Sequence, residues 1–138
     1  MRAISMTGLV CCAWLVLAGC ATAGDFDGSQ PLLCVPTDIT SCHGAGDCGR
    51  MSAEEANLPQ FVHVNFKKKT LSGKLEGGPD DSTPIQRVVM QEGYTVLQGI
   101  GQGRAWSMVI DHEHGEMSAA IAGDEGGLMV LGACTTTR

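Results

Sequence analysis

The chain has 138 residues and a formal net charge of −6 at pH 7, and only 4% of its residues are aromatic. This length allows one domain at most, because domains usually run to roughly 100–200 residues. An acidic chain without a clustered basic face lacks the electrostatic footprint of a nucleic-acid-binding protein, so we expect no nucleic-acid partner.

Residues 1–19 have the three-part pattern of a secretory signal peptide. Arg2 supplies a basic start, an almost entirely apolar run follows, and small residues precede Cys20. The apolar run is shorter than the ~20 residues of a spanning helix, and signal peptides are removed from the mature protein. We therefore expect fold and function to lie in residues 20–138.

The end of this pattern, Leu17-Ala18-Gly19-Cys20, resembles the lipobox of bacterial lipoproteins at every position. The resemblance implies cleavage after Gly19 and lipid on the sulfur and new amine of Cys20, so that the membrane is a partner. It also implies a lipid-anchored protein of the cell envelope, and Ala21 favours the outer membrane, facing the periplasm. Several acyl chains on one residue anchor a protein stably. The alternative is an ordinary signal peptide with a chance cysteine.

Residues 20–30 are small and polar and predict a lipid-anchored flexible tether, followed by a single β-domain over residues 31–138. Within that domain, runs with the two-residue period of β-strands alternate with turn signals. The first predicted element consists of residues 32–35 and 38–42, and the further predicted strands cover residues 48–52, 61–66, 70–75, 85–91, 94–99, 104–111, 116–122 and 128–134.

Two segments between these strands break the pattern. Ser52 followed by Glu55 forms a capping box, which predicts one or two helical turns before Pro59. Residues 77–82, Gly-Gly-Pro-Asp-Asp-Ser, predict a loop, because glycine, proline and aspartate all favour turns.

The fold class that follows is all-β: a small antiparallel meander of roughly eight or nine strands, curled into a barrel or barrel-like sandwich and stapled by disulfides. A domain of this size buries about 60–70% of its unfolded surface, which makes its core marginal. We expect four methionines to supplement the few aromatic side chains in that core: Met90, Met108, Met117 and Met129.

Once the signal peptide and the lipidated residue are set aside, four cysteines remain: Cys34, Cys42, Cys48 and Cys134. In an oxidising compartment an even set predicts two disulfides, with three possible connectivities. Residues 43–47 are rich in turn formers, so we favour a bond between Cys42 and Cys48. The bond between Cys34 and Cys134 would then tie the first strand to the last.

The densest cluster of possible metal ligands is Asp111-His112-Glu113-His114-Gly115-Glu116. On a continuous strand His112 and His114 would share a face, and with Glu116 they are weak candidates for a metal site. The cluster lies between two predicted strands and contains glycine, so we interpret it first as a polar hairpin tip. We expect no cofactor.

Other polar and aromatic residues have structural interpretations. His63 alternates with valines and is predicted to lie on the outer face of its strand, whereas Trp106 alternates with Met108 and Ile110 and is predicted to be a core residue. The spacing links no nucleophile to a base, and no phosphate-binding loop opens a helix. We therefore predict no catalytic residues and no enzyme.

The mature chain also carries spaced cysteines and three longer motifs: Cys34, Cys42 and Cys48, then Glu55-Ala56-Asn57-Leu58-Pro59, Ala105-Trp106-Ser107-Met108-Val109-Ile110-Asp111 and Leu131-Gly132-Ala133-Cys134. In these it resembles a family of small exported bacterial proteins of uncharacterised function. The resemblance supports the predicted fold and implies no particular site.

Our leading hypothesis is a lipid-anchored envelope protein that acts as a non-enzymatic binding or accessory module for an envelope protein partner. One alternative is a carrier of a small ligand or metal. Another is an inhibitor of a cell-wall enzyme, because lysozyme-inhibitor lipoproteins also build small disulfide-closed barrels, although their Ser-Gly-x-x-Tyr signature is missing here. A third is a hydrolase whose nucleophile and base only folding brings together.

Overall fold

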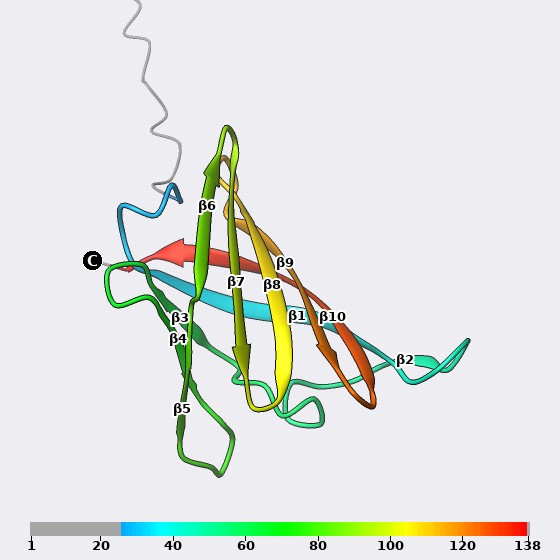
Figure 1. Cartoon of the computed structure of the whole chain (residues 1–138). Coiled ribbons are helices and arrows are strands. Elements are labelled where there is room, and N and C mark those ends of the chain that lie inside the picture. Colours follow the sequence, from blue (N-terminus) through cyan, green and yellow to red (C-terminus); the bar gives the residue numbers. More distant parts are fainter. Residues whose placement is uncertain (1–25, 138) are drawn as a thin grey trace, which may run out of the picture.

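A computed structural model of the chain describes residues 26–137, which form one ten-stranded sheet (Figure 1). The strands are β1 Leu32–Cys42, β2 Cys48–Arg50, β3 Val62–Asn65, β4 Thr70–Lys74, β5 Asp80–Pro84, β6 Arg87–Gln91, β7 Tyr94–Gly101, β8 Arg104–Asp111, β9 Glu116–Gly123 and β10 Gly126–Thr136. Their order in the sheet is β5-β4-β3-β1-β10-β9-β8-β7-β6, and β2 pairs with the end of β1. The predicted all-β, antiparallel fold is confirmed.

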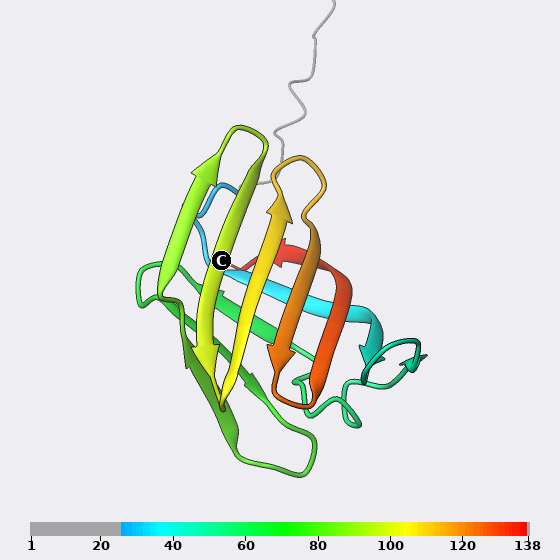
Figure 2. The ribbon, with the colours of Figure 1, turned by 45° about the vertical axis from the view of Figure 1, so that its right-hand side comes forward.

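The sheet curls into a half-barrel with two layers. β6 to β9 form one layer, β1 and β3 cross behind it, and the long β10 continues from the first layer into the second (Figure 2). β10 pairs with β9 along one side and with β1 along the other. β5 and β6, the two ends of the strand order, are consecutive in the chain, so the backbone between them draws the edges of the sheet together.

The core fills the space between the layers, and only alternate residues reach it because successive side chains point to opposite faces of a strand. Met108 and Met117 are buried as predicted, whereas Met90 and Met129 are 48% and 51% exposed. The side chain of Met129 points to the outer side of the sheet on β10, and Met90 lies on β6, at the edge of the sheet. The prediction that these two methionines fill the core is wrong. The largest fully buried side chains are Leu32, Leu97, Ile110, Val64, Thr95 and Cys34.

A glycine lets the two edges of the sheet meet. Gln86, between β5 and β6, donates its backbone N–H to the carbonyl oxygen of Gln98 in β7 over 2.9 Å, and Ile85 beside it is buried. A side chain at Gly99 would lie 2.5 Å from the carbonyl oxygen of Pro84. Glycine at this position therefore permits β5 to lie against β7, which closes one end of the half-barrel.

β5 is a strand that the sequence analysis did not predict. Its sequence, Asp-Asp-Ser-Thr-Pro, pairs with β4 from Asp80 opposite Lys74 to Pro84 opposite Thr70. It lies at one end of the strand order, where a proline is tolerated because one side of the strand needs no ladder hydrogen bond. The loop prediction is therefore wrong for residues 80–82, and the sheet has ten strands instead of eight or nine.

The folded domain begins before the predicted boundary at Pro31. Phe26, assigned to the flexible tether, is 9% exposed and belongs to the core. A side chain at Gly115 would lie 2.5 Å from its ring, so the ring covers the β8–β9 turn closely. Thr137 donates its N–H to the carbonyl oxygen of Pro31 over 2.9 Å. The two ends of the described chain therefore lie together.

The signal peptide, Cys20 and residues 21–25 of the tether lie outside the described residues. Across residues 26–137, no helix has the length and apolar composition that crossing a bilayer requires. The lipid anchor stays a prediction from the lipobox.

Candidate functional site

An apolar cavity of ≈120 Å³ lies inside the half-barrel, between the concave side of the sheet and residues 57–59. Trp106 packs against the core, as predicted, and its indole ring also forms one wall of the cavity. The cavity is partly open to solvent, and its mainly apolar lining suits a small apolar group. Its apolar walls include Leu58, Pro59, Leu71, Trp106, Ile121 and Val130.

Polar and charged side chains line another part of the same cavity. Asp81 and Thr83 come from β5, Gln102 from the β7–β8 turn, and Arg104 from the start of β8. Binding sites for small molecules usually combine an apolar lining with a few polar groups that fix orientation. An occupant with an apolar body can therefore place a polar end among these four side chains.

A capped turn, residues 52–58, lines both this cavity and a second one. The backbone N–H and the hydroxyl of Ser52 both donate to Oε2 of Glu55, over 2.8 and 2.9 Å, and the N–H of Glu55 donates to Oγ of Ser52 over 3.2 Å. The hydrogen bonds of the predicted capping box are confirmed, but residues 53–57 form a turn and the predicted helical turn before Pro59 is wrong. The backbone N–H of Ser52, followed by its hydroxyl, lowers the pKa of Glu55 below its usual value.

Replacing Glu55 with glutamine is expected to reduce the acid sensitivity of the domain. A carboxyl whose pKa is lowered by folding stabilises the native state above its unfolded pKa of about 4.3, and this stabilisation is lost as pH falls through the folded pKa. The melting temperature of the wild type should fall more between about pH 5 and pH 3 than that of Glu55→Gln. Glu54→Gln, at the exposed neighbour, should behave like the wild type. Equal slopes for all three proteins would contradict a stabilising capping box.

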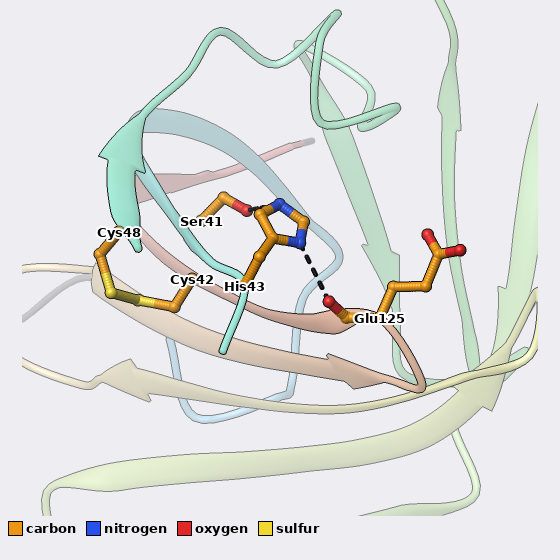
Figure 3. The surroundings of a disulfide bond; sticks show 5 residues. All are labelled: Ser41, Cys42, His43, Cys48 and Glu125. Atoms are coloured by element: carbon orange, nitrogen blue, oxygen red, sulfur yellow. Dashed lines mark hydrogen bonds between the residues drawn. A yellow bond between two sulfur atoms is a disulfide. The ribbon is translucent and has the colours of Figure 1, made fainter. Parts of the chain in front are cut away.

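The second cavity has a volume of ≈300 Å³ and is lined by more polar groups. Arg104 and Ile121 line both cavities, so the two lie side by side. Ser41 and His43 also line the second one. Oγ of Ser41 lies 2.8 Å from Nε2 of His43, and Nδ1 of His43 lies 3.0 Å from the carbonyl oxygen of Glu125 (Figure 3).

These two contacts define the tautomer of the neutral His43 ring. A carbonyl oxygen only accepts hydrogen bonds, so Nδ1 carries the proton and Nε2 accepts from the hydroxyl of Ser41. The imidazole thus joins the end of β1 to the β9–β10 turn beside the Cys42–Cys48 disulfide (Figure 3). Ser41 is 3% exposed, so we interpret the pair as a structural link. This pair was not predicted from the sequence, in which His43 directly follows β1, two residues after Ser41.

Both predicted disulfides are present. Cys34 is bonded to Cys134 and joins β1 to β10, and Cys42 is bonded to Cys48 and joins β1 to β2. In each bond the two cysteines stand directly opposite each other in the strand register. The first bond therefore ties the first long strand to the last, as predicted.

The three weak candidates for metal ligands do not converge. Nε2 of His112 lies 2.8 Å from the hydroxyl of the buried Thr95, whereas His114 is exposed beside Asp111 and Glu116 begins β9. Across residues 26–137, no three or more histidine, cysteine, aspartate or glutamate side chains lie close enough together to hold a metal ion.

The cluster around these histidines is the polar hairpin tip that the sequence predicted first. Asp111 accepts the backbone N–H groups of Glu113 and His114 over 3.0 and 2.6 Å. The bond from His114 is the main cause of the lowered pKa of Asp111. His63 is exposed on β3, so its predicted place on the outer face is confirmed.

The outward side of the sheet carries no charged residue over the central part of four adjacent strands. Antiparallel sheets usually turn polar residues to water on their open side, and extended exposed apolar patches mark interaction sites. We call these residues the convex face, which is turned toward the reader in Figure 2. They are Val96, Gln98 and Ile100 of β7, Ala105, Ser107 and Val109 of β8, Ser118, Ala120 and Ala122 of β9, and Gly127, Met129 and Leu131 of β10.

Comparison with protein-family models, with curated proteins and with solved structures found no match to this chain. The fold and the sites therefore rest on the residues of the chain itself. The similarity to a family of small exported proteins stays a prediction.

Proposed function

We propose that the chain is a lipid-anchored, non-enzymatic binding module of the cell envelope that holds a small apolar group in the cavity of ≈120 Å³ beside Trp106. This cavity is the observation that carries the proposal. The lipobox ending at Cys20 supports the location, on the periplasmic side of the outer membrane.

The size and lining of the cavity define the chemistry of the bound group. A volume of ≈120 Å³ with mainly apolar walls accepts an aromatic ring or a short aliphatic chain. Arg104 and Asp81 favour a polar or charged end at the other side of the group. An apolar side chain of an envelope protein partner and a free small molecule share this chemistry.

Filling the cavity is expected to abolish binding without unfolding the domain. Ala119 is 7% exposed and lines the cavity, so Ala119→Leu adds three carbons to a space that can hold them. We expect hexan-1-ol to cause saturable NMR shifts at residues around Trp106 in the wild type. The shifts should disappear in Ala119→Leu.

Ala120→Leu is the matched control, because Ala120 is the next residue along β9 and points to the opposite side of the sheet. It adds the same atoms outside the cavity and should leave hexan-1-ol binding unchanged. The proposal fails if the wild type shows no saturable shifts. It also fails if Ala119→Leu binds as well as the wild type does.

A further inference from the structure

The convex face has chemistry that suits contact with an identical face. Ile100, Met129 and Leu131 are 56%, 51% and 48% exposed, and none of the outward positions of the face is charged. Charged residues lie at its margins: Asp38, paired with Arg50, is opposite Leu131, Glu116 is opposite Ala133, and Arg87 is opposite Gln98. Two copies of an acidic protein repel each other in general, but they can meet through an uncharged face with the charged groups left at the rim.

The side chains of the face differ in size from strand to strand. Met129 and Leu131 on β10 are large and about half exposed, and we call this pair the ridge. A shallow hollow beside them is lined by small side chains of β8 and β9, among them Ala105, Ser107 and Ala120. A two-fold axis that runs along β9 places the ridge of each copy over the hollow of the other. Because such an axis preserves height along the strands, Met129 of one copy faces Ser107 of the other, which stands in the same row of the register.

The position of Phe26 at the start of the described chain determines how the two-fold axis is oriented relative to the bilayer. Phe26 packs on the β8–β9 turn, so the chain enters the domain at the end where β8 meets β9. Five residues, 21–25, separate Cys20 from Phe26 and span at most about 18 Å. The orientation of the domain rests on the proposed lipid anchor at Cys20. The anchor would hold the end of the domain that carries Phe26 at the bilayer. The convex face would then point parallel to the membrane, toward neighbouring proteins in the same leaflet.

We propose that the convex face is the interface of a homodimer, in which two copies anchored in one leaflet pack sheet against sheet about a two-fold axis over β9. Closed two-fold dimers are the commonest homo-oligomers, and each uses the same patch on both copies. Aligned packing of two sheets interdigitates their facing side chains.

The size of the face predicts how strong the dimer is. Four strands about 4.8 Å apart give a patch roughly 20 Å by 20 Å, so the two copies bury on the order of 800 Å² in total. This area is below the range of about 1,200–2,000 Å² of stable specific interfaces and predicts a weak dimer. Anchoring both copies in one leaflet raises their effective concentration and favours such a weak dimer.

The test is sedimentation equilibrium of the lipidated mature chain in density-matched detergent micelles. Ala120→Arg places two like charges against each other at the axis, and we expect it to weaken dimerisation at least tenfold, roughly. Ser82→Arg, at an exposed position of β5 at the other end of the strand order, should dimerise like the wild type. Met129→Lys is a second variant, at a half-exposed site, in case Ala120→Arg does not fold.

Each outcome decides the proposal. The proposal is supported if the wild type and Ser82→Arg dimerise while Ala120→Arg and Met129→Lys are monomeric. A monomeric wild type overturns it, and so does a dimer that both face variants retain. A face that instead binds the bilayer or another envelope protein gives a monomer of this chain and overturns it too. The intact mass of the same sample shows separately whether Cys20 is acylated. Binding of hexan-1-ol tests the cavity. Failure of the proposed function can therefore be distinguished from failure of the dimer.

Discussion

Replacing Cys34 and Cys134 together with alanine is expected to lower the free energy of unfolding by about 4–5 kcal/mol. The bond spans a sequence separation of 100 residues, so it removes much of the loop-closure entropy of the unfolded chain. Cys34 is fully buried and Cys134 is 8% exposed, and alanine leaves small apolar groups in both places. Single domains have free energies of unfolding of only about 5–15 kcal/mol, so this change brings the domain close to unfolding.

The second disulfide is the internal control for this prediction. Cys42 and Cys48 are separated by only 6 residues, so replacing both with alanine should lower the free energy of unfolding by about half as much, roughly 2 kcal/mol. Urea unfolding of the wild type and the two double variants, followed by circular dichroism, measures both values. Equal losses in the two variants would contradict a stabilisation set by loop length.

The pattern of the sequence determines most of the sheet, because a two-residue period and glycine-containing turns are local signals. β7 to β10 and both disulfides were predicted on that basis, and the register confirms the pairing of Cys34 with Cys134. The place of β1 between β3 and β10 is a long-range property that no local signal contains. The cysteine pairing predicted that β1 is tied to β10, and the place of β3 on the other side of β1 was not predicted.

The missed elements depend on contacts far away in the chain. The sequence of β5 is as polar as a loop, and it becomes a strand because β4 offers unpaired backbone groups on one side. Phe26 stands alone in a polar stretch, and its burial depends on Gly115, which lies in the β8–β9 turn. Neither partner can be identified from the residues nearby.

The candidate sites also differ in whether they depend on local sequence signals or on long-range contacts. The convex face was not predicted, although the central outward positions of four predicted strands carry no charge and Asp111 and Glu116 lie only at the strand ends. The cavity beside Trp106 was not visible, since it exists only where residues 57–59 and β5 lie over the concave side. Alternation correctly placed Trp106 toward the inside of the sheet but could not show that the inside is incompletely filled.

Replacing Gly99 with alanine is expected to destabilise the domain by about 2–3 kcal/mol. The added carbon would lie 2.5 Å from the carbonyl oxygen of Pro84 and 2.7 Å from Cε2 of Trp106. The first neighbour is backbone in β5 and the second is a ring packed against the core, so neither can move without displacing its surroundings. Gly49→Ala, in β2 with no atom within 4 Å of the added carbon, should change stability little.

A double-mutant cycle separates the two contacts. Trp106→Leu removes the ring, so a clash with the ring should make Gly99→Ala markedly less harmful in that background. If the loss is unchanged, the carbonyl of Pro84 is the obstacle, and Gly99 is required for β5 to lie against β7. Thermal or urea unfolding of the four proteins measures the coupling. A Gly99→Ala variant as stable as Gly49→Ala would contradict the closure of the half-barrel between these two strands.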